Sequence, residues 1–146
     1  MSSGRIETEK VGGELWLLTL RGEHDIATSP SLRDEIEQLM TICTKMVVDL
    51  SSVDFMDSSV IAALVFAQRH LGHDPHGGLT LIVAPNTPPE RVLHLVGADK
   101  SIPTYTNLEH ALVAFGSSRA GTTYRHLQPD LAGIGSVVDP KQDRGS

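Results

Sequence analysis

The fold and the function of this sequence are both indicated most clearly by residues 48–59, which read Val48-Asp49-Leu50-Ser51-Ser52-Val53-Asp54-Phe55-Met56-Asp57-Ser58-Ser59. Val47, Val48 and Leu50 belong to a short apolar run of strand-forming residues. The acidic and polar residues between positions 49 and 57 are typical of a turn. Beyond Ser58, apolar residues recur near helical spacing at Ile61, Leu64, Val65 and Leu71. The segment therefore predicts a buried strand, an acidic turn and a helix that begins at Ser58.

Ser58 is a candidate phosphorylation site because of its place at this helix start. Unpaired backbone N–H groups and the positive end of the helix dipole favour negative charge there, so the backbone would tolerate a phosphate on Ser58. Asp54 and Asp57 stand close to it in the sequence, and a phosphate adds a charge of about −1.5 to −2 that their carboxylates repel. Such a charge would change a docking surface. The alternative is that Asp57 or Ser58 only caps the helix, since Asp and Ser are among the preferred N-cap residues.

Strand and helix patterns alternate along the rest of the sequence to about residue 116. Strands are predicted over residues 6–10, 14–20, 45–50, 79–84 and 102–105, and Gly12-Gly13 would join the first two as a hairpin. Helices are predicted from Thr28 or Ser29 to residue 40, from residue 58 to 71, over residues 87–97 with a Thr87–Glu90 capping box, and over residues 108–115. This order predicts an α/β fold with a mixed β-sheet of about four to five strands covered by about four helices.

Length and composition favour one domain followed by a tail. The chain has 146 residues, of which 40% are hydrophobic, enough for one core. We expect the domain to span residues 1–116 and residues 117–146, rich in Gly, Ser, Pro and charge, to form a flexible C-terminal tail. The tail also has apolar residues that could let part of it dock or pair with a partner: Leu127, Leu131, Ile134, Val137 and Val138.

Charge and targeting signals point to a cytoplasmic protein that binds another protein. Residues 1–116 contain 8 Lys and Arg against 15 Asp and Glu, a net charge of −7, which disfavours nucleic acid and suits a basic protein partner. The alternative, that the acidic surface only keeps the protein soluble, stays open. Residues 1–10 lack the apolar stretch of a secretory signal, and the longest apolar run, residues 60–67, is too short to span a bilayer of about 30 Å. We therefore expect no membrane association and a cytoplasmic location.

Catalytic and metal-binding chemistries fit the sequence less well. A serine between strand and helix is also the arrangement of a hydrolase nucleophile, but the Gly-x-Ser-x-Gly motif is absent and Asp57 would repel an oxyanion. His70, His73, His76 and Asp74 form a candidate metal cluster, which Gly72 and Pro75 interrupt. The single Cys43 is expected to be a small buried side chain. The nucleotide-binding glycine motifs are absent. We therefore expect no enzyme activity, no metal and no cofactor.

Three segments together resemble the anti-sigma factor antagonist family, whose fold is the STAS domain. Residues 20–28, Leu-Arg-Gly-Glu-His-Asp-Ile-Ala-Thr, are similar to the family's Gly-Glu-hydrophobic-Asp turn before its first helix. Residues 48–59 are similar to its Asp-Leu…hydrophobic-Asp-Ser-Ser/Thr-Gly signature, which is the most specific of the three. Residues 83–112 are similar to its last strand and two closing helices.

The resemblance implies a function for Ser58. In this family the serine after the aspartate accepts a phosphate from an anti-sigma factor that is also a serine kinase. By resemblance, the unphosphorylated chain would bind that kinase and release a sigma factor, phosphorylation of Ser58 would abolish binding, and a phosphatase would restore it. The resemblance further implies that Asp25 and Asp57 shape an acidic pocket around Ser58. Docking contacts would come from Thr28, Ser59, Val60 and the exposed face of the following helix.

The chain departs from the family pattern at two positions. Val60 replaces the family's glycine, and a branched side chain there removes the clearance that a glycine leaves for a partner's backbone. His24 replaces an aliphatic or aromatic residue; it could make the acidic turn sensitive to pH, or it could be an ordinary surface residue of that turn. Val60 keeps a second reading open, in which the chain is a scaffold or a constitutive binding module that is never phosphorylated.

Overall fold

A computed structural model describes residues 4–115 of the chain. Its elements follow in the order β1 (Arg5–Gly12), β2 (Leu15–His24), α1 (Ser29–Met40), β3 (Lys45–Met56), α2 (Ser58–Leu71), β4 (Gly78–Ile82), α3 (Pro88–Leu95), a 3-10 turn η1 (Ala98–Lys100), β5 (Thr104–Tyr105) and α4 (Leu108–Val113). The boundary between two compact units falls within α4, after Ala111. The predicted flexible tail, residues 117–146, lies outside the described residues.

The five strands form one mixed sheet in the order β1-β2-β3-β4-β5. Strand β1 pairs with β2 antiparallel, as expected of a hairpin, and its turn contains Gly13 in the left-handed region, at a φ of 55°. The remaining neighbours pair in parallel. The predicted α/β fold with a mixed sheet and four α-helices is confirmed.

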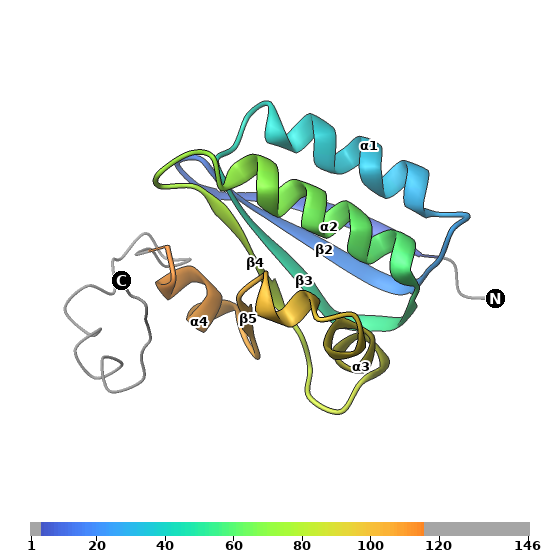
Figure 1. Ribbon diagram of the computed structural model, residues 1–146. Helices are drawn as coiled ribbons and strands as arrows, with labels where there is room; N and C mark the ends of the chain where they lie inside the picture. The colour runs from blue at the N-terminus through green and yellow to red at the C-terminus, as the bar shows by residue number, and fades with distance from the viewer. Residues whose placement is uncertain (1–3, 116–146) are drawn as a thin grey trace, which may run out of the picture. The chain divides into compact units, whose positions relative to one another are not determined.

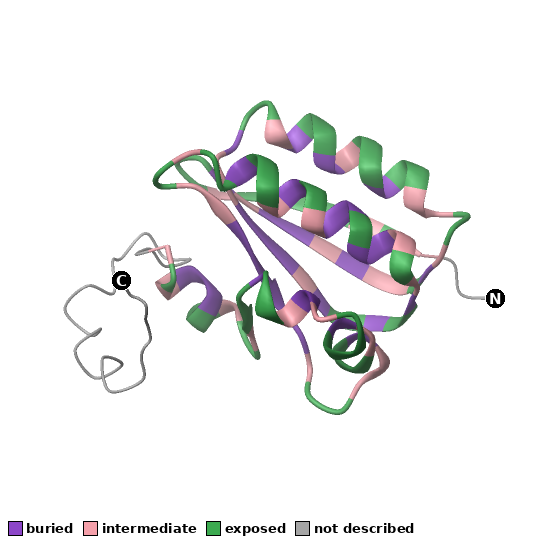
Figure 2. Ribbon diagram, viewed as in Figure 1, coloured by how far each residue is buried: buried purple, intermediate pink, exposed green. Residues whose placement is uncertain are grey.

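The core that supports the start of α2 lies between one face of the sheet and helices α1 and α2, which run side by side over it (Figure 1). Helix α1 contributes Leu32, Ile36 and Leu39, whose spacing of four and three residues places them on one face. Figure 2 shows buried residues on the sides of both helices that face the sheet and exposed residues on their outer sides. None of the helices in residues 4–115 is long and apolar enough to cross a membrane.

Strand β3 is longer than the sequence pattern predicts. The segment read as an acidic turn, residues 49–57, continues the strand to Met56, and only Asp57 lies between strand and helix. The pairing with β2 shows why. The register with β2 shifts twice, so that β3 carries one extra residue between Asp49 and Ser52 and another between Val53 and Phe55.

These two bulges reset the alternation of side chains along β3. Leu50, Val53 and Met56, three residues apart, are therefore all buried in one core, although a regular strand buries every second residue. The bulges bring the end of β3 level with the end of β2, where Met56 pairs with His24.

The other predicted elements agree with the structure to within a few residues, apart from the capping box at α3. The side chain of Thr87 makes no cap; its hydroxyl donates to the carbonyl of Ala84 at 2.6 Å. Glu90 accepts the N–H of Asn86 at 2.7 Å. Asn86 has a left-handed φ of 62°, so the chain enters α3 through a tight turn that the capping-box spacing does not anticipate.

Candidate functional site

Ser58 lies where strands β2 and β3 end side by side. His24 is the last residue of β2 and pairs with Met56, the last residue of β3. The N–H of Asp57 donates to the carbonyl of His24 at 3.2 Å, which joins the two strand ends beyond the sheet. Helix α2 then begins at Ser58, with Val60 and Ile61 buried in the first turn. The position of Ser58 is thus fixed by the paired strand ends before it and by the buried residues of α2 after it.

Asp57 is the N-cap of α2. One of its carboxylate oxygens, Oδ1, accepts the N–H of Ser59 at 3.0 Å and the hydroxyl of Ser59 at 2.5 Å. The hydroxyl of Ser59 is the main reason that the pKa of Asp57 is lowered, and the backbone N–H groups of Ser59, Val60 and Ile26 add to the effect against a smaller opposing effect of burial. The carboxylate is therefore held ionised beside Ser58.

The hydroxyl of Ser58 takes no part in the cap. Ser58 is exposed, and its hydroxyl has no hydrogen-bond partner among residues 4–115. The capping and phosphoacceptor interpretations of this segment are therefore compatible, because Asp57 does the capping while Ser58 faces solvent.

The loop between β2 and α1 carries two of the predicted site residues, Asp25 and Thr28. Oδ1 of Asp25 accepts the N–H of Ala27 at 2.9 Å, and its carbonyl accepts the N–H groups of Thr28 and Ser29 at 3.1 and 3.0 Å. Thr28 is the N-cap residue of α1, but its side chain makes no capping hydrogen bond; its hydroxyl accepts the N–H of Asp25 at 3.1 Å. Asp25 and Thr28 are half-buried and hold the loop's own shape. Whether they also contact a partner stays a prediction.

Two exposed apolar residues beside Ser58 were missed in the sequence. Ile26, in the loop, is 75% exposed, and Phe55, which pairs with Glu23, is 47% exposed. The N–H of Ile26 interacts with the carboxylate of Asp57, which brings the loop against the start of α2. The exposure of Phe55 could have been inferred from its place between the buried Val53 and Met56. That inference requires the positions of the bulges in β3, which the sequence does not give.

We use "Ser58 surface" for the exposed or half-exposed residues at this end of the sheet: Glu23, Asp25, Ile26, Asp54, Phe55, Asp57 and Ser58. It combines four carboxylates with two large apolar side chains. A surface of this kind suits a partner that offers cationic and apolar groups together.

The prediction that Val60 contributes a docking contact does not hold for its side chain. Val60 is fully buried, at 0% exposure, and belongs to the core between the sheet and α2. The reason is its position two residues after Ser58, where the first turn of the helix faces the sheet. Val60 can influence a partner only through the backbone of that turn. Ser59 is half-buried with its hydroxyl bound to Asp57, and its docking role stays a prediction.

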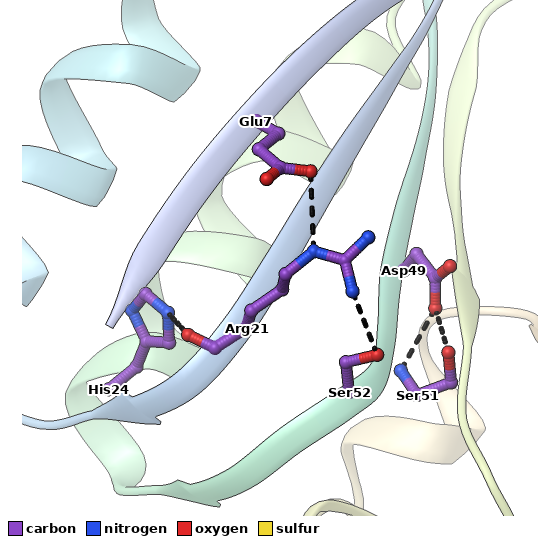
Figure 3. Close-up of polar contacts among 6 residues, drawn as sticks. All are labelled: Glu7, Arg21, His24, Asp49, Ser51 and Ser52. Carbon is purple, nitrogen blue, oxygen red and sulfur yellow. Dashed lines mark hydrogen bonds and ion pairs between the residues drawn. The ribbon is translucent and has the colours of Figure 1, made fainter. Parts of the chain in front are cut away.

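A second group of polar contacts lies on the strands leading to this site (Figure 3). The guanidinium of Arg21 contacts Glu7 on β1 and the hydroxyl of Ser52 on β3, each at 3.3 Å. Oδ1 of Asp49 accepts both the N–H and the hydroxyl of Ser51. These exposed contacts link three neighbouring strands and contribute little to stability individually.

The candidate metal cluster does not assemble. Within residues 4–115 no three His, Cys, Asp or Glu side chains are placed to hold a metal ion. Asp74 instead accepts the N–H of His76 at 2.8 Å in the turn after α2. Cys43 is buried as expected, and its burial, with a smaller effect of Glu14, raises the pKa of the thiol to about 11, so it is a poor nucleophile.

Replacing the cap should weaken the start of α2. We expect Asp57→Ala to lower the free energy of unfolding by about 0.5–2 kcal/mol, because an N-cap hydrogen bond is lost. Asp57→Asn should stay within about 0.5 kcal/mol of wild type, since Asn caps helices as well as Asp. Urea denaturation at neutral pH measures both. Asp54→Ala is the matched control: this neighbouring carboxylate is exposed, and an equal loss from both alanine variants would contradict the cap.

The lowered pKa of Asp57 predicts a dependence of stability on pH. Because the folded chain binds the proton more weakly than the unfolded chain, the stabilisation is complete above the ordinary pKa of 3.8 and is lost as the pH falls through the lower folded-state pKa. The difference in unfolding free energy between wild type and Asp57→Asn should therefore be constant from neutral pH to about 5 and should change in favour of Asn below that. A difference that stays flat to pH 2 would rule this out.

Comparison with known proteins agrees with the fold. A family model described as the STAS domain matches residues 5–111. The anti-sigma-F factor antagonist RsfB of Mycobacterium tuberculosis is 29% identical over 104 residues, which are 70% of this chain and 83% of that protein.

Two solved structures share the fold. The crystal structure of an anti-sigma factor antagonist from Mycobacterium paratuberculosis has a TM-score of 0.70 at 28% identity, covering 77% of this chain and 94% of that one. The anti-sigma factor antagonist SpoIIAA in its unphosphorylated form has a TM-score of 0.64 at 21% identity, covering 75% and 95% of the two chains, which shows likeness of fold alone. The sequence signature around Ser58, the mixed sheet and the match over residues 5–111 together show that this chain belongs to the STAS domain family.

Proposed function

We propose that this chain is an anti-sigma factor antagonist that binds an anti-sigma factor through the Ser58 surface, and that phosphorylation of Ser58 switches the binding off. The observation that carries the proposal is the exposed hydroxyl of Ser58 at the start of α2, which no other residue of the described range 4–115 engages, beside a cap formed by a different residue. The names of RsfB and of the similar structure from Mycobacterium paratuberculosis, both anti-sigma factor antagonists, support the general role.

The chemistry of the Ser58 surface supports a basic protein partner. Ile26 and Phe55 offer apolar area, and Asp54 and Asp57 add carboxylates to the same surface. Aromatic and aliphatic side chains supply most of the affinity of an interface, while charges steer the encounter and select the partner. The anti-sigma factor would bind here and release its sigma factor.

Phosphorylation would act through charge at this surface. A phosphate on Ser58 adds about −1.5 to −2 charge beside the ionised Asp57, and burying that charge against a partner is costly. The N–H groups at the start of α2 tolerate the phosphate, so the fold itself need not change. The anti-sigma factor would be the serine kinase and supply its own ATP, and a phosphatase would restore the binding form.

The chain itself acts in this proposal as a non-enzymatic binding module without a cofactor, working in the cytoplasm. Its Ser58 is modified by the partner and performs no chemistry of its own. A hydrolase would need hydrogen-bond donors near a developing oxyanion, whereas the ionised Asp57 places a negative charge there.

A second candidate is a scaffold that binds constitutively and is never phosphorylated. Val60, which stands in place of the family's glycine, keeps this candidate open, although its buried side chain does not itself block a partner's approach. Replacing Val60 with glycine is a poor test, since losing a buried valine costs about 1.5–3 kcal/mol. A kinase that binds the wild-type chain without modifying it would separate the candidates and favour the scaffold.

The proposal predicts opposite behaviour for two variants of Ser58. Ser58→Ala should bind the anti-sigma factor as tightly as wild type, whereas Ser58→Glu should bind at least about tenfold more weakly, which corresponds to roughly 1.4 kcal/mol of charge repulsion and desolvation. Titration calorimetry with the anti-sigma factors of the native cells, each purified, measures both affinities. Ser101→Glu, at an exposed serine after η1, is the matched control and should bind normally.

Phosphosite mass spectrometry on the protein from its native cells tests the modification itself. We expect a phosphoryl group on Ser58 that disappears in the Ser58→Ala protein. Its absence under both growth and stress conditions, together with equal binding by Ser58→Ala and Ser58→Glu, would reject the switch in favour of the scaffold.

A further inference from the structure

His24 is a buried histidine at the centre of the site, not a surface residue of a turn. It is 1% exposed and ends β2 beside Met56. The interpretation of His24 as an ordinary surface position is therefore wrong. The reason is non-local, because the end of β3 and Gly4 lie against a side chain that the local sequence leaves open.

Both ring nitrogens of His24 have partners. Nε2 lies 3.1 Å from the carbonyl of Arg21, which can only accept, so Nε2 carries a proton (Figure 3). Nδ1 lies 3.4 Å from the hydroxyl of Thr28. That hydroxyl has one proton to donate, and the carbonyl of Asp25, its other acceptor at 3.2 Å, already accepts two backbone N–H groups. The hydroxyl is therefore free to donate to Nδ1.

The backbone of His24 makes the complementary contact. Its carbonyl accepts the N–H of Asp57, the cap of the phosphoacceptor helix. One residue thus holds the loop after β2 through its side chain and the start of α2 through its main chain.

We propose that His24 is the positioning residue of the Ser58 surface: its Nδ1 holds Thr28, and with it the loop of residues 25–28, in a fixed place relative to Ser58. This inference rests on the proposed function, because the loop presents Ile26 and Asp25 to the partner. A residue that only filled space would need neither ring nitrogen paired. Leaving a buried polar atom unpaired is costly, so the pairing of both atoms ties the ring's orientation to the loop.

Gly4 lies against the imidazole ring of His24. A side chain at position 4 would place its Cβ 2.6 Å from Cε1 of His24 and 2.5 Å from the carbonyl of Glu23, closer than real atoms approach. The imidazole therefore lies between Gly4 and Thr28. Gly4→Ala should displace the ring from outside the loop and disturb the same contact.

Two substitutions of His24 separate positioning from packing. His24→Phe keeps the volume of the ring and removes both hydrogen bonds. His24→Asn loses volume but keeps a polar atom near the place of Nδ1, within reach of Thr28. If His24 only packs, His24→Phe should disturb the loop less than His24→Asn. If His24 positions the loop, His24→Asn should disturb the loop less than His24→Phe.

The first measurement is amide hydrogen exchange of the free full-length chain by NMR. We expect the amides of residues 27 and 28 to exchange about 3- to 10-fold faster in His24→Phe, the effect of losing one hydrogen bond, and to stay within about 2-fold of wild type in His24→Asn. The amide of Asp25 is left out, because it donates to the Thr28 hydroxyl that Thr28→Val removes. Thr28→Val, which removes the hydroxyl without removing a helix cap, should match His24→Phe, and the double variant should be no worse than either. If His24→Phe fails to fold, Thr28→Val and Gly4→Ala carry the same test.

Slow exchange in His24→Phe and Thr28→Val, with fast exchange in His24→Asn, would overturn the proposal and leave His24 a packing residue. Affinity for the anti-sigma factor is measured on the same proteins and should fall about 3- to 10-fold in the variants whose loop is released. Fast exchange of the loop with unchanged affinity would support the positioning role and count against the Ser58 surface as the binding site, so the two claims fail separately.

Discussion

The parallel pairing of β2 with β3 is the interaction on which the functional arrangement depends. Through two extra residues on β3, this pairing ends both strands at the same level, with His24 beside Met56. The hydrogen bond from Asp57 to the carbonyl of His24 then joins the strand ends, and α2 starts from that point. Without the bulges, the chain would leave the sheet in a different direction and the loop after β2 would not meet the start of α2. The main effect of the bulges is therefore to place the loop after β2 beside the start of α2.

The same few residues give the site its stability and its charge. Asp57 caps α2 through Ser59, and this contact keeps its carboxylate ionised next to the exposed Ser58. A phosphate added to Ser58 would meet a helix start that accommodates it and a neighbour that repels it. The energetic effect would thus fall on a partner at the surface and not on the core, which Val60 and Ile61 anchor directly beneath. Under the proposed function, this division would let the domain change its binding without refolding.

The parts of the fold and site that depend on local sequence could be predicted, and the parts that depend on distant residues could not. Helix α2, its aspartate cap and the exposure of Ser58 follow from residues within one turn of each other. The extension of β3 to Met56 could not be predicted, because apolar residues three apart match no strand period until the partner strand sets the bulges. The burial of His24 depends on Gly4 and Thr28, and the inward direction of Val60 depends on how α2 packs on the sheet. The expected tail after residue 116 stays a prediction.

The measurement that tests the account most directly compares NMR spectra of the chain with serine and with phosphoserine incorporated at position 58. The account predicts that amide shifts change only in residues 25–28 and 57–61, and that the phosphorylated chain no longer binds an anti-sigma factor that the unmodified chain binds. Shift changes spread through the core strands β2 and β3 would show that phosphorylation rearranges the fold. Undiminished binding by the phosphorylated chain would contradict the switch itself.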